Sequence, residues 1–181
     1  VSSRATFPSG VPVAYVASGE NFPDALVGGP AAGLRDGPIL LTRAGSLPVS
    51  VATELVRLRP SRIVVLGGPS VVSTDVENAL ADIAAVTRVF GADRYETAAS
   101  VSRSVFTPGV DRVYIATGAN FPDALAGGAV ASPSGPGGAA RAGAPILLTG
   151  PGSLPPATAT ELRRLRPKEI IILGGDGVVT S

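Results

Sequence analysis

The sequence repeats itself, and this internal repeat constrains the fold more than any other feature. Residues 15–26 (YVASGENFPDAL) return as residues 114–125 (YIATGANFPDAL), and residues 38–48 (PILLTRAGSLP) return as residues 145–155 (PILLTGPGSLP). The segments 54–60 (ELVRLRP) and 63–72 (IVVLGGPSVV) return as 161–167 (ELRRLRP) and 170–179 (IIILGGDGVV). Motifs that recur in the same order predict two copies of one structural unit. We expect the first copy over residues 1–90 and the second over residues 91–181.

The edges of the repeat indicate incomplete copies. Residues 4–11 match residues 103–110, which end a predicted helix, and the chain closes where the first copy continues as TDVENALADI (residues 74–83). We therefore expect both copies to be truncated and the chain to be part of a longer array. The second copy also contains an insertion rich in Pro, Gly and Ala around residues 132–144, which we interpret as a surface loop.

Short β-branched runs alternate with amphipathic runs along each copy. The pattern predicts strands at residues 13–18, 39–42, 63–66 and 86–90, and helices at 23–33, 48–59, 74–84 and 93–106. Thr74 and Glu77 fit a capping box for the third helix. The strands are apolar on both faces, which is typical of a parallel sheet covered by helices. We expect an α/β fold of tandem repeats, each a Rossmann-like, open, mostly parallel sheet flanked by helices.

Composition excludes several classes of function. The 181 residues contain neither Cys nor His, so disulfides, thiolate metal sites and a Ser-His-Asp triad are excluded. Fifteen basic residues against fourteen acidic ones give a net charge of +1, which does not favour a nucleic-acid binder. No apolar run approaches the roughly 20 residues of a membrane span. We expect no catalytic residue, metal, cofactor, nucleic-acid partner or membrane span.

The NFPDAL block follows a predicted strand in each copy and has two interpretations. Asn21 and Asp24, with their counterparts Asn120 and Asp123, can cap a helix and complement its positive amino end, which explains each of these polar residues. The alternative is a binding role, because loops at the carboxyl ends of parallel strands are where such sheets bind ligands. There, Asn and Asp could hydrogen-bond sugar hydroxyls.

Paired glycines end another strand in each copy. Gly67-Gly68 and Gly174-Gly175 allow positive φ and close backbone approach, which suits either a tight turn or an amide nest for an anion. Neither the dinucleotide fingerprint nor a P-loop is present, so a nucleotide site is not indicated.

A charged motif opens the second copy. Residues 93–98 (DRYETA) begin a predicted helix, where Arg94 could clamp a phosphate or carboxylate and Tyr95 could stack on a sugar. The structural alternative is a charged helix start with Tyr95 packed inward. Two basic clusters, which are either solvated helix ends or spots for a polyanion, contain Arg57, Arg59 and Arg62 in the first copy and Arg163, Arg164, Arg166 and Lys168 in the second.

The motifs GADRYETA, NFPDAL, PILLT and the LGG turn followed by two valines together resemble the cell-wall-binding repeat 2 family of Gram-positive bacteria. The resemblance covers nearly the whole chain, in two copies. It implies an open Rossmann-like fold and a module that holds surface-layer proteins and secreted enzymes non-covalently on anionic wall polymers. We therefore expect a non-catalytic, secreted anchoring module at the cell wall, whose partner is a secondary or teichoic-acid-like wall polymer.

Two other functions remain open from the residues alone. One is a metal-dependent enzyme acting on phosphate-bearing substrates, in which Asp24, Asp123 or Asp93 would hold Mg²⁺. The other is a structural surface-layer tile that self-associates. The candidate ligand-binding residues, which lie at strand ends and at the opening of the fourth predicted helix, are Arg94, Tyr95, Thr97, Asn21, Asp24, Asn120, Asp123, Gly67, Gly68, Gly174 and Gly175. We expect Arg94, residues 120–123 and the Gly174-Gly175 turn to line one binding site.

Overall fold

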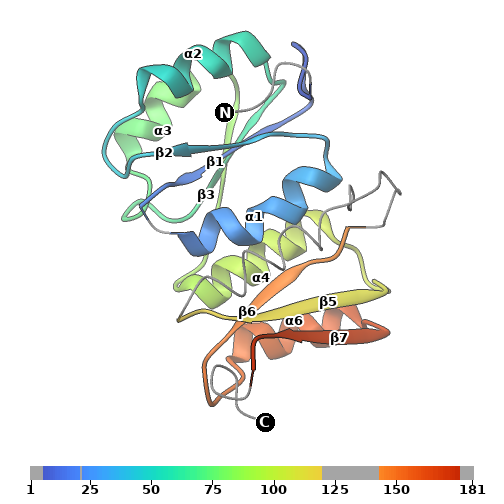
Figure 1. Ribbon diagram of the computed structural model, residues 1–181. Coiled ribbons are helices and arrows are strands. Elements are labelled where there is room, and N and C mark those ends of the chain that lie inside the picture. The colour runs from blue at the N-terminus through green and yellow to red at the C-terminus, as the bar shows by residue number, and fades with distance from the viewer. Residues whose placement is uncertain (1–5, 21, 120–142, 176–181) are drawn as a thin grey trace.

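Two parallel sheets organise the chain, one from each copy of the repeat (Figure 1). The computed structural model describes residues 6–20, 22–119 and 143–175. In the first sheet, β1 (Ala14–Ser18), β2 (Ile39–Thr42), β3 (Ile63–Leu66) and β4 (Val86–Val89) take the order β2-β1-β3-β4. In the second, β5 (Arg112–Thr117), β6 (Ile146–Thr149) and β7 (Glu169–Leu173) take the order β6-β5-β7. All of these pairings are parallel, so the predicted fold class is confirmed.

Five helices of the described ranges cover these sheets: α1 (Phe22–Leu34), α2 (Val49–Leu58), α3 (Thr74–Ala81), α4 (Arg94–Val105) and α6 (Pro156–Leu165). In Figure 1, α2 and α3 lie on one side of the first sheet and α1 lies on the other. The helices and strands agree with the predicted ranges to within a few residues. The second NFPDAL block and most of the predicted loop lie outside the described residues, as do residues 176–181.

The cap of α3 differs from the prediction. The side chain of Ser73, not that of Thr74, accepts a hydrogen bond from the backbone N–H of Val76 at 3.3 Å. Glu77 does not complete a capping box, because its carboxylate pairs with Arg88 of β4 at 2.8 Å. The helix therefore begins as predicted, but its cap is the residue before the predicted one, which binds one of the free amides of the first turn.

The two copies share a core between their sheets. Helices α1 and α4 pack on each other, and α4 also lies against β6. One apolar cluster contains buried side chains from both helices and both sheets: Tyr15, Leu26, Ala31, Val64, Ala98, Val101, Tyr114, Ile146 and Leu148. The two units therefore pack around one continuous core.

An acidic–basic pair anchors the chain segment before the first strand. Arg57, on α2, pairs with Glu54 at 2.6 Å and donates a hydrogen bond to the backbone carbonyl of Phe7 at 3.1 Å. The residues are spaced i, i+3, so both side chains leave the same face of the helix. Arg57 is thus engaged in holding the fold, whereas the sequence left its cluster as either a solvated helix end or a spot for a polyanion.

The second copy repeats this anchor with a more deeply buried acid. Arg164 pairs with Glu161 at 2.6 Å and donates to the carbonyl of Phe106 at 2.9 Å. The hydroxyl of Ser102, on α4, donates to Glu161 at 2.5 Å. Glu161 is 1% exposed, because α4 covers it. Here too the arginine that the sequence placed in a basic cluster is committed to the fold.

Candidate functional site

The strand order of the first sheet creates a crevice at the carboxyl ends of its strands. The chain leaves β1 toward β2 on one side, whereas it leaves β3 toward β4 on the other. At such a switch point the two connections diverge, and open α/β sheets bind ligands there. A pocket of about 510 Å³ opens at this place, and Asp24, Gly68, Phe90, Asp93, Arg94 and Thr97 are among the residues that line it.

Asp24 forms the inner wall of the pocket. It lies in the first turn of α1, just after β1, and is only 6% exposed. Burial raises the pKa of its carboxyl group, and the nearby charge of Arg94 partly opposes that effect. A Cβ added at Gly67 would lie 2.5 Å from Oδ2 of Asp24, and Gly67 has a φ of +103°. A glycine is therefore required at the end of β3, because the backbone has a positive φ there and because a side chain would collide with the carboxylate of Asp24.

The turn after β3 carries an aromatic ring. A Cβ added at Gly68 would lie 3.2 Å from Cδ2 of Phe90, so the ring lies over the backbone of this glycine. Phe90 is 48% exposed and lines the pocket. The sequence predicts Phe90 only as the end of a strand, so Phe90 is not among the candidate site residues named above. The signal was an aromatic residue at the carboxyl end of a parallel strand.

A second residue missed from the sequence fixes the shape of this turn. Arg88, on β4, donates hydrogen bonds to the backbone carbonyls of Gly67 at 2.8 Å and Val72 at 2.9 Å. It also pairs with Glu77 at 2.8 Å, and its side chain is 9% exposed. An arginine inside a short strand that begins and ends with valine was the available signal. Arg88 holds the glycine turn in place from behind the pocket.

Arg94 joins the two copies at the mouth of the pocket. It is the first residue of α4, which Asp93 caps by accepting a hydrogen bond from the backbone N–H of Glu96 at 2.8 Å. The guanidinium group of Arg94 donates to the backbone carbonyl of Gly118, just beyond the end of β5. Arg94 therefore lines a pocket of the first copy while it contacts a strand end of the second.

The remaining predicted residues lie in different surroundings. Thr97 is buried, and its hydroxyl accepts a hydrogen bond from the N–H of Gly91 at 3.0 Å, so it shapes the approach to α4. The ring of Tyr95 lies against Gly118, because a Cβ there would be 2.9 Å from its Cε1. Gly174 and Gly175 are exposed after β7 and do not line this pocket. Asn21, Asn120 and Asp123 lie outside the described residues.

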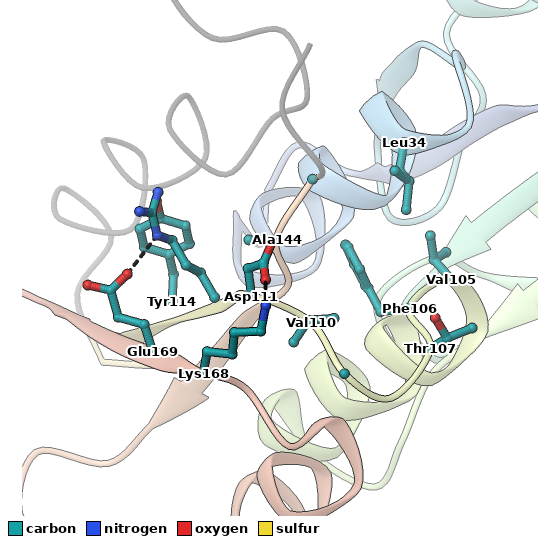
Figure 2. Close-up of a pocket in the computed structure, with 13 residues that line it drawn as sticks. Leu34, Val105, Phe106, Thr107, Val110, Asp111, Tyr114, Ala144, Lys168 and Glu169 are labelled. Carbon is teal, nitrogen blue, oxygen red and sulfur yellow. Dashed lines mark hydrogen bonds and ion pairs between the residues drawn. The ribbon is translucent and has the colours of Figure 1, made fainter. Parts of the chain in front are cut away.

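A second concavity, of about 640 Å³, opens at the amino ends of β5 and β7 (Figure 2). Its charged groups are paired with one another: Lys168 with Asp111 at 2.7 Å, and Arg112 with Glu169 at 2.6 Å. The hydrogen bond from Lys168 holds the pKa of Asp111 below its ordinary value. Lys168, whose cluster the sequence left as either a solvated helix end or a spot for a polyanion, is therefore paired with an acid. Helix α2 leads into the amino end of β3 and α6 into the amino end of β7, so each basic cluster lies at the amino edge of its own sheet, whereas Arg94 lines a pocket at the carboxyl edge of the first sheet.

The pocket at the end of β3 offers the groups that a substituted sugar requires. Asp24 and Asp93 supply acceptors for hydroxyl groups, Arg94 supplies a cation with several donors, and Phe90 supplies an exposed apolar ring. Across the described ranges, no three acidic side chains gather as a metal site would need. Nor is any helix in those ranges both long enough and apolar enough to cross a membrane.

This fold and its repeated motifs define a wall-associated class: the chain belongs to the cell wall binding domain 2 family, whose model matches residues 2–77 and 88–181. Two relatives come from Bacillus subtilis strain 168. The amidase enhancer is 33% identical over 160 residues, which are 88% of this chain and 20% of the relative. The N-acetylmuramoyl-L-alanine amidase LytC is 26% identical over 169 residues, which are 93% of this chain and 32% of the relative.

Solved structures share the architecture. Cwp8 from Clostridium difficile matches with a TM-score of 0.83 and 27% identity, over 98% of this chain and 29% of that one. Cwp6 from the same organism matches with a TM-score of 0.80 and 28% identity, over 95% of this chain and 26% of that one. The chain therefore spans less than a third of the length of either structure.

Proposed function

We propose that this chain is a non-catalytic module that retains a secreted or surface protein at the cell wall by binding an anionic wall glycopolymer. Membership of a cell wall binding family supports the location at the wall. The observation that carries the binding mode is the pocket at the switch point of the first sheet. There Asp24, Phe90 and Arg94 converge from three separate segments of the chain.

The proposed ligand is a sugar unit of the polymer that carries a negative group. The apolar face of the sugar packs on the exposed ring of Phe90, and its hydroxyls donate to the carboxylates of Asp24 and Asp93. The phosphate or carboxylate of the polymer pairs with Arg94, whose planar guanidinium suits both groups. Because two carboxylates line the same pocket, an anion placed away from Arg94 is repelled, so the charge must sit at one end of the sugar.

Retention of a large protein by such a pocket depends on repetition. A single shallow sugar site binds weakly, whereas several linked sites on one polymer strand raise the overall affinity without any new contact. The repeat provides a second set of strand ends after β5, β6 and β7, and Arg94 already contacts Gly118 at one of them. We propose that neighbouring copies bind successive units of the same polymer.

A wall-retention assay with two arginine variants on one helix tests this proposal. The chain, fused to a fluorescent protein, is mixed with purified walls before and after acid extraction of their anionic polymer. We expect Arg94→Ala to reduce retention about tenfold, the effect of losing about 1.4 kcal/mol from a charge-assisted contact. Arg103→Ala is the matched control, because Arg103 lies in the last turn of α4 and donates a hydrogen bond to Ser100 of the same helix at 2.9 Å.

Further arms of the assay separate the two parts of the site. Phe90→Ala should weaken retention with little change in its salt dependence, whereas Arg94→Ala should flatten that dependence, since salt screens only the charged contact. Circular dichroism confirms that each variant is folded. Equal retention of the Arg94 and Arg103 variants, or equal binding to extracted walls, would contradict the proposal. Release of soluble wall fragments by the purified chain would contradict a non-catalytic role.

A further inference from the structure

One wall of the proposed sugar pocket is an irregular turn. Residues 68–71 come just after β3 and line the pocket as one continuous stretch, whose middle is exposed. Within the turn, the backbone N–H groups of Val71 and Val72 both donate to the carbonyl of Gly68, at 2.9 and 3.0 Å. Connecting segments are more mobile than the elements that they join, so a turn that contacts a ligand needs support from its surroundings.

Arg88 supplies this support at both ends of the turn. Its Nη1 atom donates to the carbonyls of Gly67 at 2.8 Å and Val72 at 2.9 Å, the two residues that flank the stretch 68–71. Its Nε and Nη2 atoms donate to Oε2 of Glu77 at 3.2 and 2.8 Å, in the first turn of α3. One guanidinium group therefore joins β4, both ends of the turn and the helix that follows it.

Phe90 reaches the same turn from the same segment of the chain. It follows Arg88 by two residues, and residues two apart in an extended segment lie on the same face. The ring of Phe90 covers Gly68, where an added Cβ would lie 3.2 Å from Cδ2 of the ring. Arg88 itself keeps only 9% of its side-chain exposure and does not line the pocket. An effect of Arg88 on a bound sugar must therefore pass through the turn.

We propose that Arg88 is a positioning residue for polymer binding, which keeps residues 68–71 in the conformation that lines the pocket before the polymer arrives. This inference rests on the proposed function, because it concerns the same pocket. A wall that is formed in advance loses less freedom when a ligand binds, so it raises affinity without a new contact. When the wall is correctly formed only part of the time, the apparent affinity falls by that fraction.

Two conservative variants separate positioning from stability. Arg88→Lys keeps the positive charge opposite Glu77, but a single nitrogen does not reproduce the planar group that binds two carbonyls and a carboxylate. Glu77→Gln removes the ion pair but keeps an acceptor for Arg88, which still reaches both carbonyls. Urea titration should show that both variants are destabilised. Only Arg88→Lys should lose retention on purified walls, about fivefold if the turn is correctly formed about one fifth of the time.

The salt dependence of retention distinguishes positioning from direct contact. The cells of the comparison are purified walls at low and high salt, before and after acid extraction of their anionic polymer. Arg88→Lys should keep the salt dependence of the parent chain, because the charge is kept. Arg94→Ala should flatten that dependence, because it removes a charge that we propose contacts the polymer.

Hydrogen exchange measures the turn without any polymer. In Arg88→Lys the amides of Val71 and Val72 should exchange several-fold faster than in the parent chain, whereas in Glu77→Gln they should stay close to the parent rates. The amide of Tyr15, which is bonded to the carbonyl of Pro38 in the centre of the first sheet, reports any general loss of stability. The exchange of the turn is therefore compared with that of Tyr15 in each variant.

The possible outcomes are distinct. If Arg88→Lys is retained like the parent chain while Arg94→Ala is lost, this inference is overturned and the proposed function stands. If Glu77→Gln loses retention in proportion to its stability, Arg88 serves the fold alone and the inference is also overturned. Unchanged exchange of Val71 and Val72 in Arg88→Lys has the same consequence. If Arg94→Ala binds walls like the parent chain, the proposed pocket is wrong, and a positioning role in that pocket is wrong with it.

Discussion

Glu161 provides a sharp test of how the second copy is held together. Glu161 is 1% exposed, and its carboxylate accepts hydrogen bonds from the hydroxyl of Ser102 and the guanidinium of Arg164. Arg164 also donates a hydrogen bond to the backbone carbonyl of Phe106. Glu161→Ala removes the acceptor for the Ser102 hydroxyl and the partner of a cation at once. The change also loosens the attachment of α6 to α4.

The expected magnitude follows from burial. Breaking a buried ion pair by removing one partner costs about 3–5 kcal/mol. Arg164 keeps 30% of its side-chain exposure and can be rehydrated, so we expect the lower end, about 3 kcal/mol. With a urea m-value of about 2–3 kcal/mol/M, the unfolding midpoint should fall by about 1 M.

The first copy supplies the control. Glu54→Ala breaks the equivalent pair, but Glu54 and Arg57 are 21% and 22% exposed, so water can replace the lost contacts and the loss should be much smaller. Urea titration of both variants, followed by circular dichroism, measures the difference. If Glu54→Ala costs as much as Glu161→Ala, burial beneath α4 is not what makes the second anchor strong, and the reasoning fails.

Two further changes test the pocket. Because burial raises the pKa of Asp24, its charged form is disfavoured in the folded chain, so the free energy of unfolding should fall as pH rises from 3.8, the ordinary value, through the raised pKa. Asp24→Asn should lack this fall in the free energy of unfolding. If the urea midpoints of the parent chain and of Asp24→Asn differ by the same amount at every pH, the pKa of Asp24 is not raised in the folded chain. Gly67→Ala places a Cβ against Asp24 at a φ of +103° and should cost about 1–3 kcal/mol. Gly45→Ala, at a position with nothing within 4 Å, should be close to neutral in thermal melts, and a similar loss at both positions would refute the steric argument.

The layout of each copy could be predicted from the sequence because its signals are local. Alternating β-branched and amphipathic runs place the strands and helices, and strands that are apolar on both faces indicate a parallel sheet. The shared core was not predictable in the same way. Leu26 of α1 and Val101 of α4 read as ordinary core residues of their own copies, and nothing in their spacing indicates that they pack together.

The candidate site was predictable as separate residues but not as an arrangement. Parallel strands carry their carboxyl ends to one edge, so Asp24 and Gly68 could be expected near each other. The position of Arg94 depends on how α4 packs against α1, a long-range contact with no local signature. Conversely, the anchoring contacts of Arg57 and Arg164 could not be predicted, because the backbone carbonyls that they bind are distant in the sequence.

The core shared by α1 and α4 has a mechanical consequence. Under the proposed function, any force on the rest of the protein passes through this module to the wall polymer. If the two copies were independent domains, the force would first extend the segment that connects them and would leave each copy folded. Here Ala31 of α1 and Ala98 of α4 lie in one cluster with side chains of both sheets, so separating the copies means shearing that apolar layer as a whole. Arg94 lies where the two copies meet, because it lines the pocket of the first copy and donates to the carbonyl of Gly118 in the second. A force that separated the copies would therefore act directly on the residue that we propose binds the polymer.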